Sequence, residues 1–318
     1  GYCFAPDGKV KRSTFKISER SKRIVSPIIK MSRNGQYIVV MWRGTGPYTE
    51  TNYRIYARLY KGDCTPITDT IELTNKQSRE WYDAAIDNKG QFSLVYYNED
   101  ALLTWRRYDN TGTLTTPATA LEKLDANNSR KKCVHMIHIA VSSSNGNGVV
   151  SCQNHSSNPI YYKRFDGTGK LLDDALVEVK DTKSNSSWYA SHLLGVNDKG
   201  EFVIEWQSSY QKTFFAHFYA ADGTLTKSLT VGTAMDQIFD AFRFANIDVE
   251  LLGDDFVLRD GGNRTAAVTW YRYTPQGVKS TKATMDVKTY QRNSLRIRNG
   301  TSYIIDGKYI RVGTITFK

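Results

Sequence analysis

The chain is built from short runs of apolar residues, each about the length of a β-strand, that alternate with tight polar turns. Its first recurring unit is a pair of such strands joined by a turn rich in Asn, Asp and Gly. These residues supply the positive φ angles that tight hairpins need. The pattern therefore predicts a β-hairpin, which recurs at Ile28–Trp42, Tyr82–Tyr97, Met136–Cys152, Ala190–Trp206, Phe242–Leu258 and Ser294–Ile305.

A second recurring unit is a strand that ends in an aromatic residue, followed by three residues and then glycine. In one copy, Tyr60–Cys64, cysteine takes the place of the glycine. Successive aromatic residues of this unit stand 48 to 57 residues apart. The other copies are Phe4–Gly8, Tyr108–Gly112, Phe165–Gly169, Tyr219–Gly223 and Tyr273–Gly277.

The two units alternate along the whole chain, so each repeat holds four strands, named A to D in chain order. Four-stranded repeats of about fifty residues are the sequence mark of β-propeller blades. No segment of helical period interrupts them. We therefore predict an all-β fold, a six-bladed β-propeller of four-stranded antiparallel blades that forms a single domain over residues 1–318.

The two ends of the chain predict how the ring closes. The chain begins inside a C–D unit, Tyr2–Ser18, and ends with an A–B unit followed by the strand Tyr309–Phe317. We expect the last blade to be shared between the N- and C-termini, with Lys9–Ser18 as its outer strand. Pairing the two ends would remove free sheet edges, which otherwise invite aggregation.

Three segments carry a resemblance to a known repeat: Asn197–Trp206, Ile55–Tyr60 and Tyr162–Gly169. They resemble the tandem β-propeller repeats of secreted and surface proteins of bacteria. Blades of that family read approximately Asp-x-x-Gly-x-Phe-Val-Val-x-Trp and then Tyr-Ala-x-Arg-Phe/Tyr-Asp/Ala-x-x-Gly. The resemblance covers nearly all of the chain and implies the fold and an extracellular setting rather than an activity. The acidic calcium loops of that family have no counterpart here, so calcium is not carried over.

The four cysteines are Cys3, Cys64, Cys133 and Cys152, and none belongs to a Cys-x-x-Cys motif. An even count in a β protein rich in Thr, Ser and Asn favours disulfides and an oxidising compartment, with four reduced thiols as the alternative. Cys3 and Cys64 fall near C–D turns of neighbouring blades. Cys133 and Cys152 flank the third hairpin asymmetrically, so their pairing needs a bulge or a long turn. Of three possible connectivities, we prefer Cys3–Cys64 with Cys133–Cys152.

Composition and charge narrow the class of partner. The chain has 318 residues and a net charge of +11, and residues 1–33 hold nine basic groups against two acidic ones. A basic balance favours anionic partners. No apolar run reaches the ~18 residues that a membrane-spanning helix needs, and no aromatic and basic motif indicates nucleic-acid binding. We therefore expect neither a membrane span nor a nucleic-acid partner.

No motif for catalysis or for a cofactor emerges. The chain contains no Gly-x-Ser-x-Gly, P-loop or dinucleotide fingerprint. The string nearest to a sialidase box, Val196–Val203, lacks both the Ser and the Trp. His135 and His138 are three residues apart on a predicted strand, so they face opposite sides and cannot share a metal there. We expect no cofactor and no metal site, and the sequence favours a protein that is not an enzyme.

One rim of the predicted propeller is a candidate binding face, because the D–A connections and the B–C loops meet there. Five of the six D–A connections carry Lys or Arg, and several carry aromatic residues close to strand A. Aromatic rings stack on sugars, and basic groups pair with carboxylate or sulfate. The alternative is that the Trp-Tyr pairs wedge between blades. The predicted ligand-binding residues are Trp81, Tyr82, Asp83, Arg130, Lys131, Trp188, Tyr189, Phe239, Asp240, Tyr290 and Arg292.

These features predict a secreted or cell-surface recognition module, adhesin-like or lectin-like, that binds an acidic glycan or a host surface molecule on this face. The runner-up is a carbohydrate-active enzyme, a glycoside hydrolase or polysaccharide lyase with carboxylates at the channel mouth. Such an enzyme would require two carboxyl groups about 5–10 Å apart. The candidates for this role are Glu80, Asp83, Asp236 and Asp240.

Overall fold

The computed structural model describes most of the chain, with all described regular elements being β-strands. The described residues are 3–4, 9–13, 15, 17–18, 24–45, 53–74, 81–100, 102–122, 133, 135–153, 159–180, 192–208, 213–233, 249–260, 268–285, 294–298, 301–306 and 309–313. The chain divides into two compact units, residues 1–153 with 161–177 and residues 154–160 with 178–318. The expectation of a single domain stays a prediction.

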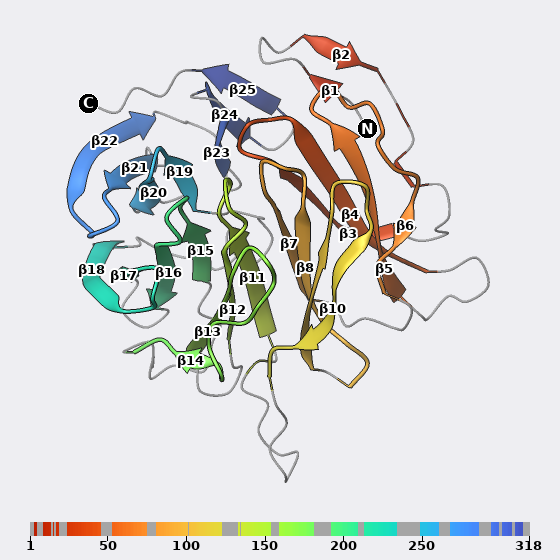
Figure 1. Cartoon of the computed structure of the whole chain (residues 1–318). Coiled ribbons are helices and arrows are strands. Elements are labelled where there is room, and N and C mark those ends of the chain that lie inside the picture. The colour runs from red at the N-terminus through yellow and green to blue at the C-terminus, as the bar shows by residue number, and fades with distance from the viewer. Residues whose placement is uncertain are drawn as a thin grey trace. The chain divides into compact units, whose positions relative to one another are not determined.

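The first unit contains three four-stranded antiparallel sheets, in which neighbours in sequence pair as neighbours in space (Figure 1). Strand β7 contacts both β3 and β11, so the first strand of the second blade lies between those of the other two. Blade 1 is β3 (Ile24–Met31), β4 (Tyr37–Thr45), β5 (Tyr53–Lys61) and β6 (Ile71–Glu72); blade 2 is β7 (Tyr82–Ile86), β8 (Phe92–Tyr97), β9 (Leu103–Tyr108) and β10 (Leu114–Ala120); blade 3 is β11 (His135–Val141), β12 (Gly148–Gln153), β13 (Ile160–Phe165) and β14 (Val177–Glu178).

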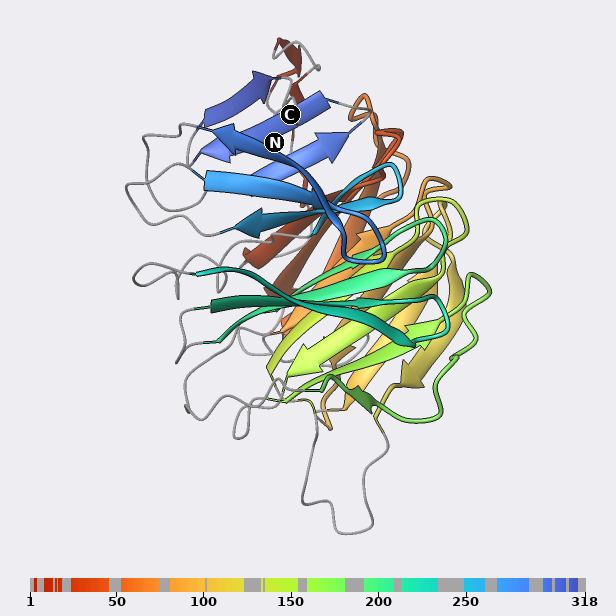
Figure 2. The ribbon, with the colours of Figure 1, turned by 90° about the vertical axis from the view of Figure 1, so that its left-hand side faces the viewer.

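The second unit contains two further four-stranded sheets and one sheet of three strands. Figure 2 shows the twist of the sheet β15–β18, which is typical of short antiparallel blades. Blade 4 is β15 (His192–Val196), β16 (Phe202–Ser208), β17 (Thr213–Tyr219) and β18 (Leu225–Thr233); blade 5 is β19 (Glu250–Leu252), β20 (Asp255–Asp260), β21 (Val268–Tyr273) and β22 (Lys279–Met285); the three-stranded sheet is β23 (Ser294–Arg298), β24 (Thr301–Asp306) and β25 (Tyr309–Gly313).

The predicted turn units are present, and their glycines have the backbone angles that the turns require. In the A–B turns, Gly35, Gly90 and Gly200 have positive φ, and in the C–D turns Gly112, Gly169, Gly223 and Gly277 do so as well. Cys64, which replaces glycine in the first blade, has a φ of 65°. The chain thus keeps the left-handed turn at this position although a side chain makes it unfavourable.

The apolar cores lie between adjacent sheets of the same unit. Along β7, Tyr82, Ala84 and Ile86 pack toward blade 1, whereas Ala85 belongs to the core that blade 2 shares with blade 3. This alternation follows from the two-residue period of a strand. In the second unit, Phe218 of blade 4 packs against Phe256 and other residues of blade 5.

Both predicted disulfides are confirmed. Cys3 bonds to Cys64 and Cys133 bonds to Cys152, with Cα atoms 6.2 Å and 5.5 Å apart, respectively. The register of β11 against β12 shifts between His135 and Ile137, and Met136 there has a φ of 25°. This irregularity is the bulge that the asymmetric position of the second pair requires.

The N-terminal segment lies against the face of blade 1 that is turned away from blade 2. Cys3, Phe15 and Ile17 pack there on a core that includes Trp42 and Tyr60. Strand β1 (Cys3–Phe4) pairs with β2 (Val10–Arg12) in a separate two-stranded sheet, and β25 pairs with β24. Among the described residues no pairing joins these two sheets, so closure through a shared last blade stays a prediction.

Candidate functional site

Three charged or titratable side chains from the first strands of blades 1, 2 and 3 meet in one cluster. The Lys30 Nζ atom lies 3.2 Å from Oδ1 of Asp83, and Nδ1 of His138 lies 3.6 Å from the other oxygen, Oδ2. Lys30 is on β3, Asp83 on β7 and His138 on β11. We call these three residues the inner-strand cluster. It joins three neighbouring blades through one carboxylate.

Asp83 is buried, which disfavours its charged form, but its hydrogen bonds and charged neighbours favour that form. Its Oδ1 accepts a hydrogen bond of 2.8 Å from the N–H of Ala84, and its Oδ2 accepts one of 3.1 Å from the N–H of Ile139. Burial raises the pKa of Asp83, but Lys30, His138 and the Ala84 N–H outweigh it, so the net pKa lies below its usual range. Asp83 therefore stays ionised inside the protein.

The residues of this cluster are about one repeat apart in the chain, which explains why the sequence did not bring them together. Asp83 was a predicted ligand residue, His138 was considered with His135 as a pair that cannot share a metal, and Lys30 was one of the basic groups of residues 1–33. Their contact depends on how neighbouring blades pack. The spacing of about one blade was the only sequence signal that connects them, and it does not say which residue types meet.

A second group of residues lies where β4 ends and where β5 and β7 begin, at the end of the blades that carries the B–C and D–A loops. The Arg43 guanidinium carbon lies 4.9 Å from the centroid of the Tyr53 ring, a cation–π arrangement. The buried Tyr82 hydroxyl donates a hydrogen bond to the Ser26 carbonyl oxygen. Burial raises the pKa of Tyr82, and the nearby Arg43 charge counters part of this effect. Arg43 was not among the predicted site residues.

The structure places three of the eleven predicted ligand-binding residues. Trp81 is partly buried and packs against the core shared by blades 2 and 3, Tyr82 is buried on the side of blade 1, and Asp83 belongs to the inner-strand cluster. These contacts are those of a wedge between blades, as in the alternative interpretation of the Trp-Tyr pair. The other eight lie outside the described residues: Arg130, Lys131, Trp188, Tyr189, Phe239, Asp240, Tyr290 and Arg292.

The carboxylates proposed for an enzyme give little support to catalysis. Asp83 is engaged by two backbone N–H groups and two cationic or titratable side chains, so its oxygens are already occupied. A general acid needs a raised pKa, and a nucleophile needs an open face. Glu80, Asp236 and Asp240 lie outside the described residues. Within the part of the chain that the structure describes, no group of three or more His, Cys, Asp or Glu could hold a metal ion.

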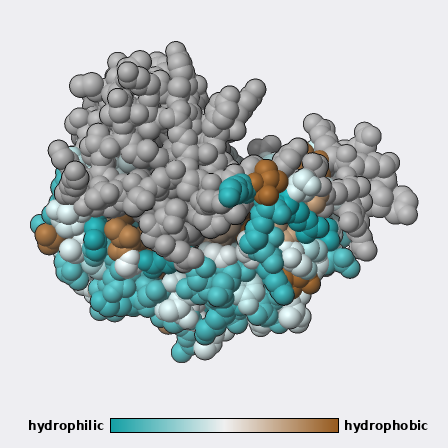
Figure 3. Space-filling model, turned by 90° about the horizontal axis from the view of Figure 1, so that it is seen from above, coloured by the Kyte–Doolittle hydropathy of each residue, from teal (hydrophilic) through white to brown (hydrophobic). Residues whose placement is uncertain are grey.

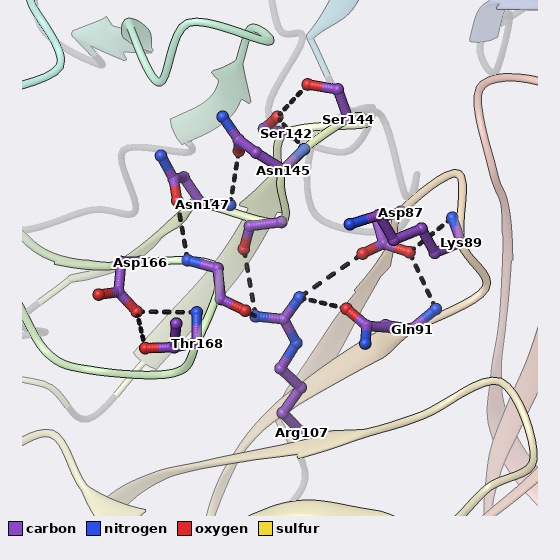
Figure 4. A network of polar contacts seen from close by, with 12 residues as sticks. Asp87, Lys89, Gln91, Arg107, Ser142, Ser144, Asn145, Asn147, Asp166 and Thr168 are labelled. Atoms are coloured by element: carbon purple, nitrogen blue, oxygen red, sulfur yellow. Dashed lines mark hydrogen bonds and ion pairs between the residues drawn. The ribbon is translucent and has the colours of Figure 1, made fainter.

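The opposite end of the blades is linked by a network of polar turns, which we call the turn network (Figure 4). The buried Arg107 donates hydrogen bonds of 2.7 Å to the Gly167 carbonyl and 2.9 Å to Gln91 Oε1, and its Nη2 lies 3.5 Å from Asp87 Oδ2. Arg107 Nη1 also donates to the Gly146 carbonyl at 3.4 Å. A Cβ on Gly146 would lie 2.2 Å from Nη2, and Gly146 has a φ of 73°, so a larger residue there would displace the guanidinium and strain the backbone. Arg107 thus joins blade 2 to both turns of blade 3.

Neighbouring A–B turns are also joined directly to one another. The Asn34 N–H donates to Asn88 Oδ1 at 2.9 Å, and the Asn88 N–H donates to the Ser143 carbonyl at 2.9 Å. In the second unit, Asn197 Nδ2 donates to the Asp254 carbonyl at 3.1 Å. The Asn and Asp residues that the sequence marked as turn formers therefore also connect blades.

The described surface is predominantly hydrophilic in the view of Figure 3, with apolar residues as separate spots. The most exposed large apolar side chains are single residues such as Ile29 and Val278, which are 61% and 60% exposed. Isolated apolar residues of this kind are normal on soluble proteins. Among the described residues, no helix is long and apolar enough to cross a membrane.

Comparison with known proteins supports the fold and assigns no family. No family model matches the chain, and no curated protein matches it. Among solved structures, a polysaccharide lyase, the PL25 ulvan lyase bound to -[GlcA(1-4)Rha3S]-, is 11% identical with a TM-score of 0.52, over 96% of this chain and 81% of that one.

Two further solved structures have similar scores. The β-propeller domain of the Trilobed protease from Pyrococcus furiosus is 12% identical with a TM-score of 0.50, over 94% of this chain and 84% of that one. AofleA from Arthrobotrys oligospora is 11% identical with a TM-score of 0.52, over 92% of this chain and 84% of that one. At this identity the likeness concerns the fold alone. Together with the repeated four-stranded sheets, it defines the class: the chain is an all-β protein, a six-bladed β-propeller.

Proposed function

We propose that this propeller is a secreted or cell-surface recognition module, lectin-like or adhesin-like, that binds an acidic or sulfated glycan at the end of the blades formed by the B–C and D–A loops. The observation that carries the proposal is the half-buried ring of Tyr53 at that end, which lies against the buried guanidinium of Arg43. A flat ring beside a guanidinium combines the two groups that recognise an anionic sugar. Trp81, which is partly exposed, begins the next blade at the same end.

Three further facts support this proposal. The net charge of +11 favours an anionic ligand. The two disulfides are consistent with an extracellular setting, because disulfides persist in oxidising compartments. The ulvan lyase, which has the same fold, was solved with an anionic saccharide of GlcA and Rha3S, although that ligand is a property of that protein. The sequence also assigns the eight predicted residues outside the described part to this face.

A glycan array that contains sulfated, uronic-acid and neutral glycans tests the proposal, followed by a salt titration of each positive result. We expect binding to acidic glycans that weakens as ionic strength rises, since exposed charge pairs are screened. Arg43→Gln and Trp81→Ala should each weaken binding about tenfold or more. Lys89→Gln, which removes an exposed charge from an A–B turn, is the matched control and should bind like the wild type. An array without binding, or binding that is indifferent to salt, would refute the acidic-glycan proposal.

A further inference from the structure

Strand β3 contains a β-bulge at a residue whose backbone angle is unfavourable. The register of β3 against β4 shifts between Val25 and Ile28, where β3 carries an extra residue. Within this bulge Ser26 has a φ of 52°, in the left-handed region that residues with a side chain rarely adopt. Pro27 follows, and the residue before a proline is restricted to extended angles. The backbone of β3 is therefore strained at Ser26.

A side chain from the next blade holds this bulge. The Tyr82 hydroxyl of blade 2 donates a hydrogen bond to the Ser26 carbonyl oxygen, and the buried Tyr82 ring packs in the core of blade 1 with Ile28. Burial raises the pKa of Tyr82, so the hydroxyl keeps its proton and remains a donor. Ser26 itself is exposed, so burial of its own side chain does not offset the strain. Strained backbone persists where surrounding groups hold it in place, as the Tyr82 hydroxyl does here.

The bulge decides which residue of β3 lies opposite Arg43. Beyond the bulge, Val25 pairs with Arg43, near the end of β4. An extra residue in one strand changes the pairing and turns the strand, so a bulge re-aims the side chains that follow it. The Arg43 guanidinium lies against the Tyr53 ring, and its charge also acts on the Tyr82 hydroxyl. Tyr82 is therefore close both to the bulge and to the cation whose strand the bulge adjusts.

We infer that Tyr82 is a positioning residue for the glycan face: its hydroxyl holds the strained bulge of β3 at Ser26 and thereby fixes the strand end that carries Arg43. This inference rests on the proposed function, in which the Tyr53 ring, backed by Arg43, meets the glycan. Tyr82 acts in this role through Ser26 and needs no contact with the ligand. Without the hydroxyl, Ser26 can return to an extended angle, and Arg43 then moves relative to Tyr53.

Amide hydrogen exchange tests the hold on the bulge without any glycan. Tyr82→Phe keeps the buried ring and removes the hydroxyl, so exchange over residues 24–29 should become about fivefold faster than in the wild type. Tyr108→Phe is the matched control: the buried Tyr108 hydroxyl donates to the Leu73 carbonyl of blade 1 at 3.1 Å, and Leu73 has no positive φ. This control should leave exchange over residues 24–29 unchanged. Equal exchange in the wild type and Tyr82→Phe would overturn the inference.

Binding of a heparin fragment, which combines sulfate with uronic acid, tests the effect on the face. Tyr82→Phe should bind it about fivefold more weakly than the wild type, and Tyr108→Phe should bind like the wild type. Ser26→Gly in the Tyr82→Phe background should restore binding, because glycine adopts a positive φ without strain and keeps the bulge. Equal binding by the wild type and Tyr82→Phe, or a loss that Ser26→Gly does not restore, would refute the positioning role. If the wild type does not bind heparin, the proposed function loses support, and exchange still decides whether Tyr82 holds the bulge.

Discussion

The inner-strand cluster and the turn network join the same blades by opposite means. Asp83 and Asp87 stand four residues apart, at the start and just beyond the end of β7, and both are buried. Asp83 has an ammonium at 3.2 Å, whereas Asp87 has a guanidinium at 3.5 Å, the charge of Lys89 and the turn N–H groups of Lys89 and Gln91. The pKa of Asp83 is lowered, but burial raises the pKa of Asp87 in spite of these partners.

This contrast shows that a buried carboxylate does not by itself reveal its role. Where a cation lies close enough, the pair offsets the cost of burial, and the carboxylate becomes a charged link between blades. At Asp87 the effect of burial is larger than that of the nearby charges and hydrogen bonds, so its pKa is raised. Arg107, the partner of Asp87, also has its pKa lowered by burial. The turn network therefore depends on hydrogen bonds to carbonyl and amide groups, and the inner-strand cluster depends on charge.

The largest effect should come from removing the charge of Asp83. Asp83→Asn preserves the shape but leaves the buried Lys30 without its anion, and breaking such a pair costs about 3–5 kcal/mol. Denaturant unfolding near neutral pH measures this loss. Asp109→Asn, in an exposed C–D turn, is the control and should cost less than about 1 kcal/mol because an amide oxygen can accept the same turn bonds. Similar costs for the two variants would remove the distinction between the cluster and an ordinary turn.

A smaller but clear effect should follow from breaking the turn network at its centre. Arg107→Met removes the donors to the partly buried Gly167 carbonyl and Gln91 side chain, and takes the guanidinium away from the buried Asp87. We expect a loss of about 2–3 kcal/mol in the free energy of unfolding. Arg54→Met, which breaks the exposed pair of Arg54 with Glu72, is the matched control and should cost under about 1 kcal/mol. If both variants were equally stable, Arg107 would be no more than a surface residue.

The smallest and most specific effect concerns how the stability penalties of Asp83→Asn and Asp87→Asn change with pH. The two penalties should change in opposite directions. A lowered pKa gives stability that is present above the unfolded carboxyl value of about 4 and is lost as pH falls through the folded pKa. A raised pKa gives stability that is present below that value and is lost as pH rises. The penalty of Asp83→Asn should therefore shrink as pH falls, and that of Asp87→Asn should shrink as pH rises.

Free energies of unfolding of these two variants and the wild type, measured from about pH 3.5 to about pH 8, show the two slopes directly. Parallel slopes would mean that the two carboxylates are in equivalent environments, which would contradict the comparison.

The repeat architecture of this protein could be predicted from its sequence because the information is local. A turn that needs positive φ favours Gly or Asn at that position, and Gly35 and Gly112 have positive φ in the structure. Cys64 is the exception in residue type, but it keeps the positive φ of the turn. Alternating apolar residues then define strands, and their spacing defines blades. The disulfides followed from the same reasoning, since the blade arrangement placed Cys3 close to Cys64.

Contacts between blades were decided by the tertiary structure alone. Lys30, Asp83 and His138 come from three repeats, and nothing in any single repeat marks them as partners. The same is true of Arg107 beneath the turns of blade 3. The physical reason is that strand and turn propensities act over a few residues. Whether a buried charge finds a partner depends on the packing of sheets whose residues are about fifty positions apart.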